Sequence, residues 1–448
     1  MSERKSKDGT VNNSPADSSQ DDSAGLPAVL SANHSANHSA NHSVNLSAGF
    51  PDALPAALPV YFRYNKKNAY SYSALVPALP GATFSKKPEN GIMIYSFFTN
   101  QKEDIFEEIC QARADRLNSF FIAGGPHPSG AAAKTLEYFD AVVIGEGEET
   151  LPKMVSRILE NERKGIDRKT GFEEIAGIAF KNNVGGIVIT PPGPAVELDK
   201  FPCFSPNSIW RPLEISRGCP HRCKFCQTPQ MFGYKMRHRS VSEIVKYAAY
   251  YDDLRFLSSN AFAYGGNGVT QKPEKVKDLL SSLSNLGGKR IFFGTFPSEV
   301  RPEFATEDMI DLVVKYCAND SLSIGAQSGS DTVLNEIGRG HSAEDVYNAA
   351  EVCLGAGITP IVDFIIGFPS ETITDQEKTL EMIDWLCRNG GKVHAHYLTP
   401  LPSTPYEHSV PAKVHPDISK KLGKLALGGQ LTGVWENIKQ RTVENKDG

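Results

Sequence analysis

Long apolar segments are missing from this sequence. None of its 448 residues lies in a run approaching the roughly 18–20 apolar residues of a membrane span, and the N-terminus has no apolar signal core. These absences exclude an integral membrane protein with helical spans. They predict a cytoplasmic protein that has no membrane partner.

A strong charge of one sign is also missing. The 47 Lys and Arg residues nearly balance the 52 Asp and Glu residues, which gives a formal net charge of −5. No basic stripe and no appended RNA-binding pattern is present. We therefore expect no nucleic-acid partner.

Cysteine is scarce outside one short segment. Three of the eight cysteines fall within eight residues, Cys219, Cys223 and Cys226, while five are scattered. A disulfide framework would use its cysteines evenly in a short secreted chain, so it is excluded. Most of the scattered cysteines sit in apolar helical patterns and are expected to be buried, namely Cys110, Cys317, Cys353 and Cys387.

Composition and periodicity divide the chain into four parts. Residues 1–55 are rich in Ser, Asn, Ala and Asp and repeat Ser-Ala-Asn-His, which predicts a disordered, non-catalytic tail. Residues 56–195 alternate strands (59–64, 91–99, 118–125, 141–145) with helices (101–115, 129–138, 148–160) and end in a hairpin over 175–192. This alternation predicts a Rossmann-like parallel sheet.

A second alternating series occupies residues 205–408. Its expected strands are 213–218, 254–259, 290–296, 321–327, 359–368 and 392–398. Six strand–helix repeats are fewer than the eight of a closed barrel, so the fold class is α/β with a partial (β/α)6 barrel after the Rossmann-like domain. Residues 409–448 form a C-terminal extension with a possible helix near 417–427.

The three clustered cysteines have the spacing Cys219-x3-Cys223-x2-Cys226 directly after a strand. Three thiolates this close can hold one face of a 4Fe–4S cluster and leave the fourth iron open. The alternative is a structural zinc site or a non-enzymatic metal-binding module. Structural zinc normally needs four ligands in two separated pairs, and no second Cys-x2-Cys exists; His221 could complete a site only with awkward geometry.

The cysteine motif, with Phe225 before its last cysteine, resembles the signature of the radical S-adenosylmethionine (SAM) superfamily. The segments 324–330, 334–341 and 366–369 resemble later strands of the subgroup that includes methylthiotransferases. The resemblance implies a 4Fe–4S cluster and SAM, which binds the open iron and yields a 5′-deoxyadenosyl radical. Two departures leave the holder of the methionyl amine open: Gln327 replaces a frequent Glu, and residues 258–262 replace a Gly-Gly-Glu segment. The candidates for SAM contacts are Phe225, Ser259, Asn260, Gln327 and Arg339.

The run from Phe121 to Leu151 resembles the cobalamin-binding domain of cobalamin-dependent (class B) radical SAM enzymes. The resemblance implies that two turns lie beside the corrin, with the contact residues Gly124, Gly125, His127, Gly145, Glu146, Gly147 and Glu148. No Asp-x-His-x-x-Gly motif supplies an axial histidine. The alternatives are a packing domain without cofactor, and for His127 a simple turn residue.

Together the resemblances imply methylation of an unactivated carbon, with ferredoxin or flavodoxin as electron donor. The segments 293–303 and 394–407 look like archaeal members, which favours a peptide or protein substrate such as methyl-coenzyme M reductase in a methanogen. Tyr264 and Glu299 are the preferred catalytic candidates among polar residues near the strand ends, with Thr295, Ser298, Arg301, Asp363, His394, His396 and Tyr397. The alternatives are cobalamin-free radical chemistry and, less favoured, methylthiotransfer, which uses three further N-terminal cysteines where this chain has Cys110.

Overall fold

The computed structural model describes residues 58–204 and 212–436. The tail expected over residues 1–55 lies outside the described residues. Within the two described ranges, no helix is both long and apolar enough to cross a bilayer.

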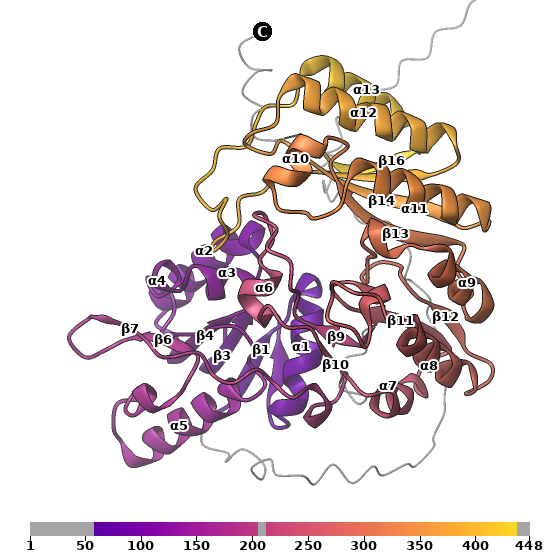
Figure 1. The fold of residues 1–448 in the computed structure, drawn as a ribbon. Coiled ribbons are helices and arrows are strands. Elements are labelled where there is room, and N and C mark those ends of the chain that lie inside the picture. Colours follow the sequence, from indigo (N-terminus) through magenta and orange to yellow (C-terminus); the bar gives the residue numbers. More distant parts are fainter. Residues whose placement is uncertain (1–57, 205–211, 437–448) are drawn as a thin grey trace, which may run out of the picture. The chain divides into compact units, whose positions relative to one another are not determined.

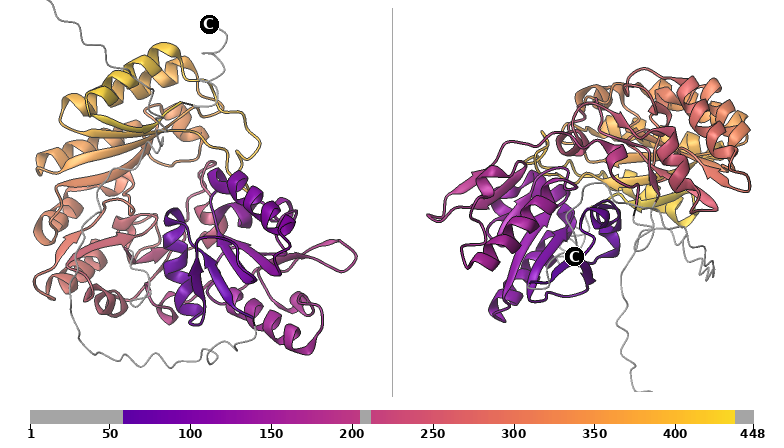
Figure 2. Two further views of the ribbon diagram at one scale, coloured as in Figure 1. Left: turned by 180° about the vertical axis from the view of Figure 1, so that it is seen from behind. Right: turned by 90° about the horizontal axis from the view of Figure 1, so that it is seen from below.

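The first domain is a seven-stranded sheet whose order is β2-β1-β3-β4-β5-β6-β7 (Figure 1). Five strands run parallel: β1 (Val60–Arg63), β2 (Thr83–Ser85), β3 (Gly91–Ser96), β4 (Ser119–Gly124) and β5 (Ala141–Val143). The predicted hairpin adds two antiparallel strands, β6 (Ile178–Lys181) and β7 (Ile187–Ile189), and projects from the sheet (Figures 1 and 2). The Rossmann-like prediction is confirmed, with β2 as an unpredicted edge strand.

Alternating side chains of the strands give this sheet two cores. Along β3, Ile92 and Ile94 enter one core and Met93 and Tyr95 enter the other. One face is covered by α1 (Ala69–Leu75) and α5 (Thr150–Lys164), the other by α2 (Lys102–Ala114) and α4 (Ala132–Thr135). A run of six buried residues such as β3 is typical of a parallel sheet with both faces covered.

The second domain contains parallel strands in the order predicted for a partial barrel. They are β8 (Leu213–Glu214), β11 (Asp253–Leu257), β12 (Arg290–Phe292), β13 (Ser321–Gln327), β14 (Thr359–Ile366), β15 (Lys392–Tyr397) and β16 (Leu431–Val434). A parallel bridge between Val300, in the segment after β12, and Ile324 joins that segment to β13. The predicted six strands are confirmed, but β16 is a seventh, so the sheet continues past residue 408. Its four residues include a glycine, which makes it a weak strand signal.

Six helices pack against these strands in one shared core. They are α7 (Val241–Ala248), α8 (Pro273–Ser284), α9 (Glu307–Tyr316), α11 (Ala343–Gly355), α12 (Ile373–Arg388) and α13 (Pro416–Leu427). Along β14, Val362, Phe364 and Ile366 point into this core, so Asp363 points to the opposite, inner face. The helix expected near 417–427 is α13.

Candidate cofactor-binding site

The segment Cys219–Cys226 lies in the connection between two short strands that pair with each other. It follows β9 (Ser216–Arg217), which pairs antiparallel with β10 (Arg237–His238). The Cys219 N–H donates to the carbonyl of Gly233 at 3.2 Å. The cysteine loop is therefore anchored at the carboxyl end of the first barrel strand, where barrel enzymes carry their chemistry.

Gly218 sets the turn that begins the loop. Its φ is +90°, and a Cβ at this position would lie 2.3 Å from the Lys235 carbonyl oxygen. Only glycine fits both the backbone conformation and this close approach. Ser259, a predicted SAM contact, donates its hydroxyl to the Gly218 carbonyl at 2.7 Å, so it supports the turn directly before Cys219.

The three thiols are free and close enough to influence one another electrostatically. Burial raises the pKa of Cys219, and the neighbouring Cys226 and Cys223 raise it further. Across residues 58–204 and 212–436, no three His, Cys, Asp or Glu side chains are grouped tightly enough for a single metal ion. His221 has its Nε2 beside the Gly268 carbonyl oxygen, 2.9 Å away. The His221 ring is thus already bonded to the backbone, and three cysteines are the number that holds a 4Fe–4S cluster with one open iron.

Buried polar atoms without partners surround this loop. Asn260 is 3% exposed, and neither its Oδ1 nor its Nδ2 has a hydrogen-bond partner. Arg339 places Nη1 3.8 Å from Cys223 Sγ, while its Nε is unpartnered. Further unpartnered atoms are Arg301 Nη1, Ser298 Oγ and His341 Nδ1. Because buried polar groups are nearly always paired, these donors and acceptors fit a polar ligand such as SAM beside the cluster.

Gln327 ends β13 in an unusual backbone conformation. Its φ is +77°, it lies at a bulge between β13 and β14, and it is buried. A Cβ at Gly325 would lie 2.9 Å from Gln327 Nε2 and 2.8 Å from Arg339 Nη2. Gly325 therefore leaves the space into which both predicted SAM contacts reach, and strain of this kind is concentrated at functional sites.

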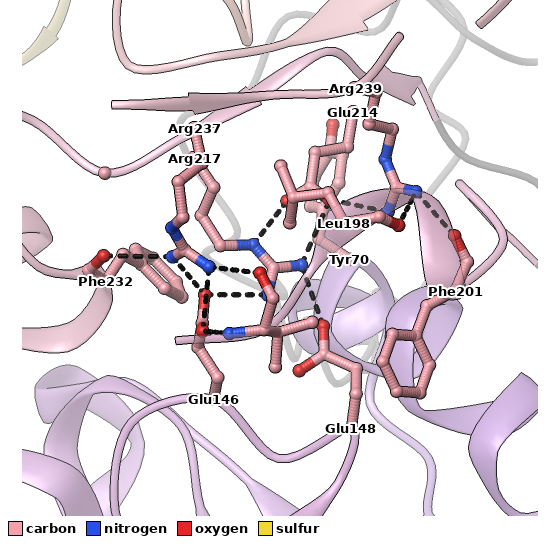
Figure 3. Close-up of polar contacts among 12 residues, drawn as sticks. Tyr70, Glu146, Glu148, Leu198, Phe201, Glu214, Arg217, Phe232, Arg237 and Arg239 are labelled. Carbon is pink, nitrogen blue, oxygen red and sulfur yellow. Dashed lines mark hydrogen bonds and ion pairs between the residues drawn. The ribbon is translucent and has the colours of Figure 1, made fainter. Parts of the chain in front are cut away.

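A largely buried network of six charged residues is centred on Arg217 (Figure 3). It joins three carboxylates to three guanidinium groups, namely Glu146, Glu148, Glu214, Arg217, Arg237 and Arg239. Arg217, two residues before Cys219, bonds Glu148 at 2.8 Å, Glu214 at 2.8 Å and Glu146 at 3.0 Å. The network thus connects the loop after β5 with the strand that carries the cluster motif.

The charges in this network hold one another in the ionised form. Burial by itself would raise the pKa of Glu214, but Arg217 and Arg239 hold it below its usual value. Burial would lower the pKa of Arg217, but Glu148 and Glu214 keep it well above its usual value. The carboxylates of Glu146 and Glu148 are paired with arginines, and their predicted position beside a corrin stays a prediction.

Two glycines of the predicted corrin turns, Gly125 and Gly147, are required by packing inside the first domain. Gly125 has a φ of +89°, and a Cβ there would lie 2.6 Å from Ser96 Oγ. A Cβ on Gly147 would lie 2.9 Å from Leu75 Cδ2. Gly145 has a φ of +78°, and Gly124 meets only ordinary contacts. The close approach of Gly125 and Gly147 is therefore to protein atoms.

His127 is buried in an aromatic niche at the start of α3 (Pro126–Gly130). Its ring lies 5.7 Å from Phe97 and 6.2 Å from Phe106, and its Nδ1 lies 3.2 Å from Thr99 Oγ1. Burial lowers the pKa of His127 to about 4, so the ring is neutral. These contacts match the alternative of a structural turn residue.

A small polar cavity of about 30 Å³ lies at the carboxyl ends of β1 and β3. In a doubly wound sheet, ligands usually bind between two adjacent strands whose onward connections run in opposite directions. β1 and β3 are such a pair, because β1 leads to β2 on one side and β3 leads to β4 on the other. Two buried amide atoms at this edge have no partner, Asn68 Oδ1 and Gln101 Nε2. These two atoms could bond to the polar groups around the rim of a ligand that covers this edge of the sheet, such as a corrinoid. The cavity itself has room only for water.

The remaining predicted residues divide into two groups. Phe225 packs on Phe368 at 5.7 Å, and Tyr264 is buried with its hydroxyl donated to the Arg239 carbonyl at 2.7 Å. The catalytic role predicted for Tyr264 finds no support in these contacts, because its hydroxyl already serves the backbone. Glu299, by contrast, lies on the inner side of the barrel, since its neighbour Val300 bridges Ile324 and points into the core.

The residues missed by sequence reasoning are the partners of the charge network. Arg217, Arg237 and Arg239 were not singled out, although Arg217 stands directly before the Gly-Cys of the motif. Glu214 lies inside a short strand, where a buried carboxylate is itself a signal that a cation is near. No pattern in the sequence reveals that Glu146 and Arg237, 91 residues apart, are paired at 2.5 Å.

Comparisons with known proteins agree with this geometry. Residues 213–383 match the model of the radical SAM superfamily. A protein of Methanocaldococcus jannaschii named for methylthiotransferase activity is 26% identical over 307 residues, covering 63% of each chain. An uncharacterized methyltransferase of Pyrococcus horikoshii is 25% identical over 67% of this chain and 65% of its own length. The chain thus spans somewhat less than two thirds of these relatives.

Two solved structures share the fold of both domains. The methyltransferase TsrM of Kitasatospora setae, with cobalamin and a [4Fe–4S] cluster bound, aligns with a TM-score of 0.59 at 16% identity, over 78% of this chain and 76% of its own. The cobalamin-dependent radical enzyme OxsB aligns with a TM-score of 0.57 at 17% identity, over 73% of this chain and 52% of its own. Residues 213–383 thus match the radical SAM superfamily model, and the two domains together share the fold of TsrM and OxsB.

Proposed function

We propose that this chain is a radical SAM methyltransferase that binds a 4Fe–4S cluster, SAM and cobalamin and methylates an unactivated carbon. The observation that carries the proposal is the loop with three free cysteines after the first barrel strand, with buried polar atoms that have no hydrogen-bond partner nearby. Bound there, the cluster and SAM supply a carbon radical, and cobalamin supplies the methyl group.

The protein's own residues have distinct tasks in this proposal. Cys219, Cys223 and Cys226 hold the cluster, and Arg339 places a positive charge 3.8 Å from Cys223 Sγ. Asn260 offers both a donor and an acceptor to SAM. The buried position of these groups keeps water away from the reactive centre.

Electrons must reach the cluster from a donor protein, for which ferredoxin or flavodoxin is the proposed class. Arg222 and Lys235 are exposed on and beside the cysteine loop, and the Arg222 guanidinium stacks over the Tyr234 ring at 4.4 Å. Such a basic edge suits an acidic donor, because complementary charge speeds encounter.

Methylthiotransfer is the second candidate, because one relative is named a methylthiotransferase and another a tRNA-2-methylthio-N(6)-dimethylallyladenosine synthase. Methylthiotransferases resemble this chain but use three further cysteines before the barrel for a second cluster. Residues 56–195 contain only Cys110. Cobalamin-free radical chemistry is the other alternative, and it differs from the proposal in its cofactor content.

The test is anaerobic purification with iron, sulfide and hydroxocobalamin, followed by SAM turnover. About four irons per chain, a corrinoid retained through gel filtration, and both 5′-deoxyadenosine and S-adenosylhomocysteine are the expected result. The matched variants are Cys223→Ala, which should lose the cluster, and Cys353→Ala, which removes a buried thiol far along the sequence. About eight irons would favour a second cluster, and a cluster without retained corrinoid would refute the cobalamin part.

A further inference from the structure

The inner face of the barrel carries a continuous row of side chains across its later strands. Asp363 on β14 is in register with Gly325 on β13 and His394 on β15, and His394 is in register with Thr432 on β16. Registered partners in a parallel sheet point to the same side. Since Val362 and Phe364 point outward into the core, this row faces inward.

Glu299 joins the row from the segment before β13. The Val300–Ile324 bridge places Glu299 on the same side as Gly325. A Cβ at Gly325 would lie only 3.4 Å from Glu299 Oε2. The missing side chain of Gly325 therefore gives Glu299 access to the space over Asp363.

The two carboxylates repel each other and share one cation. Burial raises the pKa of Asp363 well above its usual value, and the charge of Glu299 raises it further, while Arg339 opposes the shift. Burial also raises the pKa of Glu299, and Arg339 again opposes it. Arg339 divides its charge between this pair and the Cys223 thiol, 3.8 Å away. Arg339 is thus a cation that the pair shares with the cysteine loop.

His394 adds an independent sign that a ligand belongs in this row. Its Nε2 is buried and has no hydrogen-bond partner, although the residue sits next to Asp363 on the neighbouring strand. Its ring lies against that of His396, with the ring centroids 4.3 Å apart and the planes tilted by 37°. Burial lowers the pKa of His394 to about 4, so it is a neutral group with one donor and one acceptor nitrogen.

We propose that Glu299, Asp363 and His394 form the substrate-recognition end of the barrel and bind a nitrogen group of the substrate that donates hydrogen bonds. The inference rests on the proposed function, since it assigns a substrate class to the same radical site. Guanidinium and ammonium groups satisfy two carboxylates as cations, and a primary amide satisfies them if the pair keeps one proton. Carboxylate or purely aliphatic groups satisfy neither.

The test uses N-acetyl amino-acid amides as probes on the anaerobically reconstituted protein with SAM, with affinity read by ligand-observed NMR. The arginine, lysine and glutamine amides are the donors. The glutamate and norleucine amides are matched non-donors of similar size. Donors should bind at least about tenfold more tightly than non-donors, a difference of about 1.4 kcal/mol.

Variants then locate the binding. If the site recognises a cation, Asp363→Asn should weaken binding of the arginine and lysine amides at least about tenfold. Binding of the glutamine amide should weaken by a similar factor only if the two carboxylates share a proton. Glu299→Gln serves if Asp363→Asn does not fold. Asp311→Asn removes an exposed carboxylate from α9 and should change nothing.

Three results would overturn the inference: equal binding of the glutamate or norleucine amide, unchanged donor affinity in both variants, or no binding by any probe. The proposed function is read separately, from iron content and 5′-deoxyadenosine. A protein that cleaves SAM but ignores nitrogen donors keeps the function and loses this inference. One that binds donors without assembling a cluster does the reverse.

Discussion

Glu148→Gln tests whether the buried charge network supports the cysteine loop. The substitution keeps the shape of the side chain and one acceptor oxygen for Arg217, but it removes one of three negative charges facing three positive ones. Glu148 and Arg217 are 5% and 7% exposed at their side chains, so solvent cannot replace the lost charge. One positive charge is then left buried without a counterion.

The expected magnitude follows from this imbalance. Breaking one partner of a buried pair costs about 3–5 kcal/mol, and Arg217 keeps Glu146 and Glu214. We therefore expect the lower end, about 3 kcal/mol off the free energy of unfolding. The neighbouring Glu149→Gln is the matched control, because Glu149 pairs at the surface with Lys153 at 3.6 Å and such pairs contribute about 0–1 kcal/mol.

The assay is anaerobic urea denaturation of the reconstituted protein, with iron content measured alongside. Glu148→Gln should lower the unfolding midpoint and reduce iron retention, and Glu149→Gln should do neither. Combining Glu148→Gln with Arg217→Gln restores charge balance, so the double variant should lose at least about 1 kcal/mol less than the sum of the single losses. Additive losses, or a Glu148→Gln midpoint equal to that of Glu149→Gln, would refute the reasoning.

Three further predictions use other sites. Burial raises the pKa of Glu371 to about 7 from a usual 4.5, so the folded protein binds this proton more tightly than the unfolded chain. Protonation therefore adds about 3 kcal/mol to the free energy of unfolding below pH 4.5, and this stability is lost as the pH rises through 7. Glu371→Gln can still accept the Gly367 N–H, and its denaturation curves should depend less on pH between pH 5 and 8. Gly125→Ala should cost at least about 1–2 kcal/mol of stability, because its φ is +89° and its Cβ would lie 2.6 Å from Ser96 Oγ; an unchanged melting temperature would contradict this. Asn260→Ala should weaken SAM binding roughly 3–10-fold in equilibrium dialysis without destabilising the protein, since it removes two unpartnered buried atoms; lost stability with intact SAM affinity would assign Asn260 to the fold.

The spacing of apolar residues and the positions of turn residues were sufficient to predict most of the fold. The alternation of apolar runs in residues 56–195 and 205–408 predicts the parallel strands because a strand covered on both faces is apolar throughout, as β3 shows. β16 was missed because four residues with a glycine carry almost no periodic signal. Its place is decided by pairing with β15, an interaction between distant parts of the sequence.

The candidate site was predictable only where the chemistry is local. Cys219, Cys223 and Cys226 lie within one turn-bearing loop, so their spacing alone indicates a cluster. The direction of the Tyr264 side chain could not be predicted, because it depends on the residue after β10, where the Arg239 carbonyl accepts its hydroxyl. Asp363 could not be ranked above its neighbours from the sequence, because the face of β14 that packs into the core was not known.

The charge network gives two residues of a predicted corrin turn a structural role of their own. Glu146 and Glu148 alternate with glycines in a turn, a pattern that suits a backbone approaching a ligand. Their carboxylates nevertheless bind Arg217 and Arg237 on the strands that flank the cysteine loop. Three bonds of 2.5–3.0 Å in a buried setting make the position of this turn depend on the position of that loop. A ligand that shifts the backbone of residues 145–148 must therefore either break these ion pairs, at a cost of several kcal/mol, or move the base of the cysteine loop with it.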